Sequence, residues 1–130
     1  MKHILAPILL ALTFSVMFSS CSFAGWMKMG ENVSGDTFYV DYERIRKHDG
    51  LVYFWVLGDY LKPDGDGTLS SKVYRQGDCK LFRYKGLSYS FHKEPMGGGA
   101  GETVNRKNPE WKYPSPNSML ELILKYVCSR

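Results

Sequence analysis

Hydrophobic residues form one long uninterrupted run at the start of the chain and only short segments after it. The run covers residues 4–18, follows a short positive start, and leads into small residues. This order is typical of a secretory signal peptide. With 15 residues and a proline inside it, the run is shorter than the roughly 20 residues that a membrane-spanning helix needs. We therefore expect residues 1–24 to be a signal peptide, residues 25–130 to form a single domain, and the mature protein to have no transmembrane span.

Two processing routes remain open at the end of this signal. The letters SFA at residues 22–24 supply the small residues of ordinary signal cleavage. The letters FSSC instead resemble a bacterial lipobox, which would limit the signal to residues 1–20 and lipidate Cys21. Because Phe18 stands where a lipobox usually has leucine, cleavage after Ala24 is the favoured route, and lipidation of Cys21 is the alternative.

The pattern in the rest of the chain predicts strands. Short segments rich in β-branched and aromatic residues are bounded by Gly, Asn, Asp and Pro, as in β-rich domains. Residues 51–60 are apolar on both alternating faces, which indicates a central strand covered on both sides. Asp41 is expected to cap a short helical turn that ends at Asp49 and Gly50, and residues 93–108 are expected to form a loop. The predicted strands cover residues 25–30, 36–41, 51–60, 68–76 and 79–91, with a short edge segment at 110–114.

The last segment has a helical pattern. Its apolar residues recur at spacings of three, four, seven and eight, which places them on one stripe of a helix. The helix can begin with Ser115 as its cap and Pro116 in the first turn, or with Asn117 or Ser118 as its cap. A helix of about 11 to 13 residues is marginal alone, so we expect it to pack its stripe on the strands in an α+β fold. The stripe residues are Leu120, Ile123, Leu124, Val127 and Cys128.

The number of cysteines predicts one disulfide bond. Whether Cys21 is removed with the signal or lipidated, Cys79 and Cys128 remain as a pair. An exported protein folds in a compartment where disulfides persist. A bridge between these two cysteines closes a loop of about 50 residues. Closing such a loop stabilises the fold by about 4 kcal/mol in the chain-entropy estimate. We therefore expect Cys79 to be bridged to Cys128, holding the C-terminal helix in place, and not to be a reactive thiol.

Basic and aromatic residues alternate in the segment GDCKLFRYKGLSYSF, which begins at Gly77. A strand has a side-chain period of two, so its residues divide between two faces. One face is expected to carry Leu81, Arg83, Lys85 and Leu87, and the other Phe82, Tyr84 and Ser88. A candidate partner-binding strip, suited to an acidic protein or glycan, consists of Lys80, Arg83, Tyr84 and Lys85. The alternative is an ordinary solvent-exposed strand surface.

The charge balance argues against a dedicated polyanion binder. The chain has 17 Lys and Arg against 13 Asp and Glu, and loss of Lys2 with the signal leaves a net charge near +3. The segment KGLSYSF matches the RNA-binding RNP1 pattern only incompletely. We therefore expect no nucleic-acid partner.

No motif for catalysis or for a metal is complete. Ser88, His92 and Glu94 lie near one strand end, but nothing in the sequence fixes them as nucleophile, base and orienting group. His48 and His92 are isolated and lack the spacing of metal ligands. The letters DGDG at residues 64–67 lack the spacing of an EF-hand loop and instead predict a hairpin turn. We expect no enzymatic activity, no metal site and no cofactor.

Several segments, taken in their order and spacing, resemble the surface-adhesin protein E family of small exported bacterial proteins. The resemblance runs from Trp26 to Cys128, through WMKMG, FYVDYERIRKHDGLVYFWVLGDY, SSKVYRQGDC and YSFHKEPMGGG, then Trp111, PNS and the closing VC. It implies an antiparallel sheet of about six strands with the C-terminal helix held across it by a disulfide between Cys79 and Cys128. It also implies a surface-exposed binder of host extracellular proteins such as vitronectin and laminin, sometimes dimeric.

Two hypotheses for the function follow. The first is a non-catalytic exported binding protein, a surface adhesin for host extracellular-matrix proteins or for another acidic protein or glycan. The alternative is a lipid-anchored or periplasmic structural or assembly subunit of the bacterial envelope with no host ligand. The expected location is the periplasm, the outer-membrane surface or the medium, and a homodimer is compatible with both hypotheses.

Overall fold

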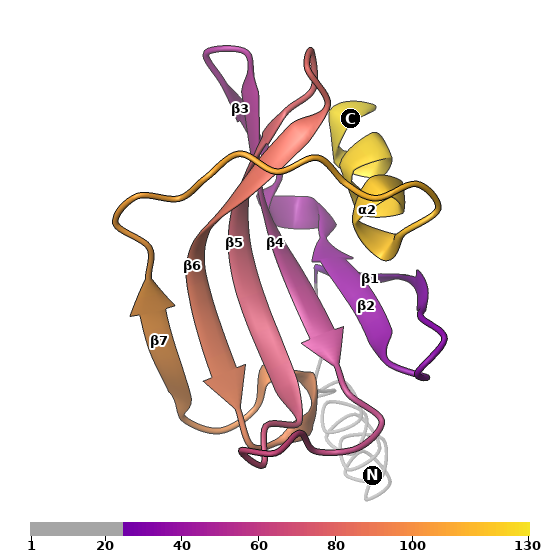
Figure 1. Cartoon of the computed structure of the whole chain (residues 1–130), viewed down its shortest axis with the longest axis vertical. Helices are drawn as coiled ribbons and strands as arrows, with labels where there is room; N and C mark the ends of the chain where they lie inside the picture. The colour runs from indigo at the N-terminus through magenta and orange to yellow at the C-terminus, as the bar shows by residue number, and fades with distance from the viewer. Residues whose placement is uncertain (1–24) are drawn as a thin grey trace, which may run out of the picture.

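The computed structural model describes residues 25–130 (Figure 1). The predicted signal peptide at residues 1–24 and the candidate lipidation residue Cys21 lie outside the described residues. In chain order the elements are β1 (Trp26–Glu31), β2 (Thr37–Asp41), η1 (Tyr42–Arg44), β3 (Arg46–His48), β4 (Leu51–Asp59), β5 (Ser70–Asp78), β6 (Arg83–His92), η2 (Pro95–Gly97), β7 (Gly101–Asn105) and α2 (Met119–Cys128).

The described strands form one antiparallel sheet of seven strands. Their order is β1-β2-β4-β5-β6-β7, and β3 pairs with the part of β4 that β2 does not reach. Figure 1 shows α2 lying at one end of the sheet, while the other half of the same face has no helix over it. The predicted α+β class, with an antiparallel sheet and a C-terminal helix, is confirmed.

The core lies where α2 covers the sheet. Alternate residues of β4 point towards the helix and are fully or almost fully buried, and β2 contributes Val40. Each such side chain stabilises the fold by about 1.5–3 kcal/mol on burial. The buried cluster consists of Val40, Val52, Phe54, Val56, Ile123, Leu124 and Val127.

The opposite face of β4 is only half-covered. Tyr53 and Trp55 stay partly exposed there, and both rings lie beside Tyr74 of β5, with ring centroids 6.2 and 4.9 Å away. The expectation that residues 51–60 are covered on both sides therefore holds fully for one face only. Tyr74 shields this part of the face, whereas Leu57 near the other end of β4 is fully buried beside η2, where a Cβ at Gly97 would lie 3.5 Å from Leu57 Cδ1.

The segment after β2 differs from its prediction. Asp41 does cap a helical turn, since its Oδ1 accepts a hydrogen bond from the Glu43 N–H at 3.2 Å, but this turn is the short 3-10 helix η1. The chain then forms β3, which pairs with β4 through a tight turn at Asp49 and Gly50. These two residues have φ values of 51° and 76°, and such left-handed pairs are the ones that join hairpin strands.

The expected loop at residues 93–108 is wrong at its centre. Residues Gly101–Asn105 form the edge strand β7, which pairs with β6 along its length. All of its side chains are exposed, so its position depends on backbone pairing and not on a hydrophobic pattern. The glycine-rich part is also held in place, because the Ser70 hydroxyl donates to the Glu94 carbonyl at 2.6 Å and accepts from the Gly97 N–H at 2.8 Å.

A bulge changes the faces of β6. Its register against β5 shifts between Tyr74 and Arg75, and Leu87 is the extra residue. Arg83 and Lys85 share one face and Tyr84 lies on the other, as predicted. Ser88, however, falls on the face of Arg83, because one inserted residue reverses the alternation beyond it.

The C-terminal helix begins at Met119 with Ser118 as its cap, the shortest of the three predicted starts. The Ser118 Oγ accepts from the Glu121 N–H at 3.2 Å. Cys79 and Cys128 form the predicted disulfide, with Cα atoms 5.6 Å apart, and it links the end of α2 to the turn after β5. Among residues 25–130 no helix has the length and hydrophobicity needed to cross a membrane.

Candidate functional site

Asp78 shapes the turn that carries the predicted partner-binding strip. The turn covers residues 79–82 between β5 and β6. Oδ1 of Asp78 accepts from the backbone N–H groups of Lys80 and Leu81, both at 3.1 Å, and its Oδ2 accepts from Arg83 Nε at 3.0 Å. The Leu81 N–H and then the Arg83 guanidinium favour the ionised carboxylate, so the pKa of Asp78 lies below its ordinary value of 3.8 despite partial burial.

Arg83 and Lys85 both contact the indole ring of Trp111. The Arg83 guanidinium carbon lies 4.4 Å from the ring centroid and the Lys85 ammonium lies 4.3 Å from it. The contact forms because Lys112 pairs with Tyr84 of β6 through two backbone hydrogen bonds of 2.9 and 2.8 Å. We call Arg83, Lys85 and Trp111 the basic–aromatic edge.

The structure divides the predicted strip. Arg83 and Lys85 belong to the basic–aromatic edge, and Lys80 is exposed in the adjoining turn. Tyr84 lies on the opposite face, where its ring is 5.1 Å from the guanidinium carbon of Arg75. Sequence reasoning did not include Trp111 in the strip, although its place in a predicted edge segment was a usable signal.

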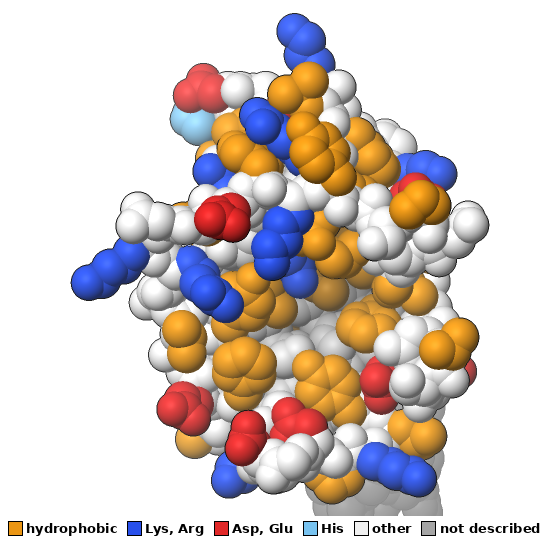
Figure 2. Space-filling model, in the orientation of Figure 1, with side chains coloured by type: hydrophobic (Ala, Val, Ile, Leu, Met, Phe, Trp, Pro, Cys, Tyr) orange, Lys and Arg blue, Asp and Glu red, His pale blue; other side chains and the backbone are white. Residues whose placement is uncertain are grey.

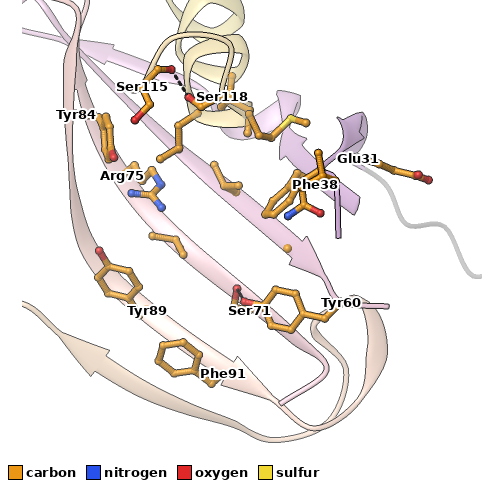
Figure 3. Close-up of a pocket in the computed structure, with 18 of the residues that line it drawn as sticks. Glu31, Phe38, Tyr60, Ser71, Arg75, Tyr84, Tyr89, Phe91, Ser115 and Ser118 are labelled. Atoms are coloured by element: carbon orange, nitrogen blue, oxygen red, sulfur yellow. Dashed lines mark hydrogen bonds between the residues drawn. The ribbon is translucent and has the colours of Figure 1, made fainter. Parts of the chain in front are cut away.

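A groove lies on the half of the α2 face that the helix leaves open. It has a volume of about 920 Å³, and Figure 2 shows it as a hollow bordered by hydrophobic side chains with Lys and Arg gathered along its upper side. Figure 3 shows the rings of Phe38, Tyr60, Tyr89 and Phe91 around it. Its apolar lining also includes Val56, Val73, Val104, Met119, Leu120 and Ile123.

Arg75 brings a cation into this apolar groove. Its Nε is enclosed and has no hydrogen-bond partner among the described residues. Burial lowers the pKa of the Arg75 guanidinium from its usual value, while the neighbouring phenols of Tyr89 and Tyr84 act in the opposite direction. An arginine stays charged at neutral pH under such conditions. The mixed polarity of the predicted strand at residues 68–76 was the only sequence signal for it.

The residues weighed for catalysis do not form a relay. The Ser88 hydroxyl donates to Asn105 Oδ1 at 2.8 Å, whereas His92 Nε2 is hydrogen-bonded to the Ser90 hydroxyl at 2.9 Å. The His92 ring is buried, and within residues 25–130 no hydrogen bond joins it to Ser88.

The predicted turn at residues 64–67 is confirmed. Oδ1 of Asp64 accepts from the N–H groups of Asp66 and Thr68, both at 2.9 Å. His48 is exposed beside Asp49, with 3.1 Å between Nε2 and Oδ2. Within residues 25–130, His, Cys, Asp and Glu side chains do not gather in threes as metal ligands do.

The fold is similar to solved structures of Haemophilus influenzae protein E. Crystal form II has a TM-score of 0.64 at 18% identity, covering 84% of this chain and 91% of that chain. A selenomethionine form has a TM-score of 0.63 at 19% identity, covering 84% of this chain and 89% of that chain. Protein E from a non-typeable strain has a TM-score of 0.59 at 18% identity, covering 85% of this chain and 79% of that chain. At these identities the likeness shows the fold.

The family itself follows from the sequence match. The family model described as surface-adhesin protein E matches residues 26–129. The chain therefore belongs to the surface-adhesin protein E family, and the predicted resemblance is confirmed. This is a family of exported bacterial surface proteins. No curated protein matches the chain in sequence.

Proposed function

We propose that the chain is a non-catalytic surface adhesin that binds a host extracellular protein through the basic–aromatic edge and Lys80. The observation that carries this proposal is the contact of two cations, Arg83 and Lys85, with the ring of Trp111 at an edge of the sheet. Trp and Arg are the residues that most often dominate the binding energy of protein interfaces. Family membership supports the adhesin class.

The electrostatics of this edge support an acidic partner. Lys85 forms no ion pair with any Asp or Glu of residues 25–130, so its charge is available to a partner. Arg83 is paired with Asp78 at 3.0 Å and is held in a fixed position. A fixed side chain loses little conformational entropy when a partner binds. The edge therefore combines one free cation, one positioned cation and a flat ring.

Binding to immobilised vitronectin and laminin tests the proposal. We expect Lys85→Glu and Trp111→Ala each to weaken binding about tenfold or more, as loss of an interface hot spot does. Arg83 is left unchanged because its loss would also disturb the turn held by Asp78. Lys62→Glu, an exposed charge reversal in the loop before β5, is the matched control and should bind like the natural protein.

Unchanged affinity in both edge variants would remove the edge from the function. Absence of binding to both matrix proteins would favour the alternative, a structural or assembly subunit of the envelope. The lipid-anchored form of that alternative also predicts membrane partitioning that Cys21→Ser abolishes. The intact mass of the exported protein separates cleavage after Ala24 from lipidation at Cys21, since only the second leaves a lipid-bearing residue at the new N-terminus.

A further inference from the structure

Two cavities meet at the arginines on the α2 face of the sheet. The first is the groove of about 920 Å³, whose lining is mostly apolar. The second is a smaller and more polar cavity of about 430 Å³. The residues that line both are Arg75, Tyr84, Tyr89 and Arg106. The molecule therefore changes from an apolar surface to a cationic one across a single row of side chains.

The apolar side has the size and composition of a site for a small molecule. Ligand pockets occupy about 300–1,000 Å³ and are lined mainly by hydrophobic and aromatic side chains with a few placed polar groups. Phe91 and Val104 of the groove are exposed at 38% and 45%, without a covering element in residues 25–130. Apolar surface left open in this way usually marks a binding site.

The cationic side is prepared for an anion. The Arg75 guanidinium stacks on Tyr84 and that of Arg106 on Tyr89, with 5.1 and 5.2 Å between guanidinium carbon and ring centroid. Stacking orients each guanidinium, and the Tyr89 phenol lies within hydrogen-bonding reach of the Arg75 guanidinium, while Arg75 Nε has no partner among the described residues. Neither arginine forms an ion pair with an Asp or Glu of residues 25–130. Enclosed cationic groups are normally paired, so the unpartnered Arg75 Nε indicates a missing acceptor.

The other charged groups of the two cavities do not supply this acceptor. Glu110 lines the polar cavity without pairing with either arginine, and Lys112 beside it adds positive charge. Glu31 lines the far end of the groove, where it pairs with Lys28 at 3.5 Å. The charged side chains at the junction of the two cavities therefore leave an excess of positive charge, which favours an anionic ligand.

We propose that the groove binds a long-chain anionic amphiphile of the fatty-acid class, with its carboxylate held by Arg75 and Arg106 and its alkyl chain lying along the apolar lining. A carboxylate matches the fork geometry of guanidinium N–H groups. An alkyl chain suits a wall made of sheet-face side chains, because it needs no hydrogen bonds there. A peptide would leave amide groups unpaired against the same wall. This site is separate from the basic–aromatic edge, so it does not rest on the proposed adhesin function.

Displacement of a fluorescent dansyl-labelled undecanoic acid from the exported protein tests the site. Laurate, dodecanol and dodecyltrimethylammonium are compared as competitors below their micelle concentrations, because they share a chain length and differ in head-group charge. We expect laurate to compete about tenfold or more better than dodecanol, as a charge-assisted pair with arginine would give. Dodecyltrimethylammonium should compete least.

Variants assign this preference to the arginine. Arg75→Met should abolish the preference for laurate over dodecanol, and Arg75→Lys should retain part of it. Arg46→Met, which removes an exposed arginine of β3 outside the groove, is the matched control and should behave like the natural protein. Val104→Glu places a negative charge on the exposed rim of the groove. It should weaken the binding of laurate more than the binding of dodecanol. Circular dichroism checks whether each variant folds. If Arg75→Met does not fold, the Val104→Glu variant still tests the proposal.

Three results would overturn the proposal. They are equal competition by laurate and dodecanol, an unchanged laurate preference in folded Arg75→Met, and displacement of the dye by an acidic apolar peptide but not by laurate. The last result would make the groove a protein-docking surface.

Discussion

The Leu124 side chain of α2 lies directly against Gly77 of β5. A Cβ added at Gly77 would stand 2.9 Å from Leu124 Cδ1 and 2.9 Å from Val52 Cγ1. Real Cβ atoms do not approach other atoms so closely. The helix therefore reaches the sheet at this point only because β5 has no side chain there, and this contact of the core depends on a glycine.

Gly77→Ala should destabilise the domain by about 1–3 kcal/mol, the usual cost of overpacking a core. Urea denaturation followed by tryptophan fluorescence measures this change. Gly65→Ala is the matched control, because a Cβ there meets no atom within 4 Å. A folded Gly77→Ala variant as stable as the control would contradict the close packing of α2.

Loss of the disulfide should destabilise the fold without changing its topology. The bridge joins residues 49 apart in sequence, and removing a native disulfide from a small exported domain costs about 2–5 kcal/mol. The double variant Cys79→Ser and Cys128→Ser should therefore unfold at lower urea concentration. The natural protein treated with a reducing agent should unfold at the same midpoint as the double variant. A midpoint that neither treatment moves would mean that the bridge does not hold α2 to the sheet.

Asp78 should make stability depend on pH in the acidic range. Its pKa is lowered in the folded state, so its ionised form stabilises the fold. This contribution is complete above the ordinary value of 3.8 and is lost as the pH falls through the lower folded value. Asp78→Asn should thus be less stable than the natural protein at pH 7, with a difference that shrinks on acidification.

Urea denaturation midpoints of Asp78→Asn and of the natural protein, measured between about pH 7 and pH 2.5, give this difference in stability at each pH. The exposed loop residue Asp66 offers a control, because its carboxylate accepts no hydrogen bond from the described residues. Asp66→Asn therefore removes a charge without removing a contact. A difference between Asp78→Asn and the natural protein that stays constant over the whole range would contradict the role of the ionised carboxylate.

Much of the fold could be predicted because its signals are local. The apolar alternation of β4 and the stripe of α2 come directly from side-chain periods of two and 3.6. The pairing of Cys79 with Cys128 followed from parity and export. These features need no knowledge of distant neighbours.

The features that were missed depend on neighbours in space. β7 carries no hydrophobic pattern, because as an edge strand it needs only backbone partners from β6. The bulge at Leu87 arises from the fit between two strands, so a single strand's period cannot predict it. It places Ser88 on the face of Arg83 and so overturns the predicted side for that residue.

The candidate sites depend on such contacts even more strongly. Trp111 lies 26 residues beyond Lys85 in the sequence and reaches it only through the backbone bridge between Tyr84 and Lys112. Arg75 belongs to a strand whose polarity is mixed, and only the fold shows that it faces an apolar groove (Figure 3). Sequence could identify the basic residues of β6 but not the aromatic ring that groups two of them.

Hydrogen exchange of the exported protein, with and without bound vitronectin or laminin, tests the proposed adhesin surface most directly. We predict that binding slows exchange at residues 80–85 and 110–113, which carry the basic–aromatic edge, and leaves the loop at residues 61–67 unchanged. Slowed exchange confined to other parts of the sheet, with residues 80–85 and 110–113 unaffected in a saturated complex, would contradict the account.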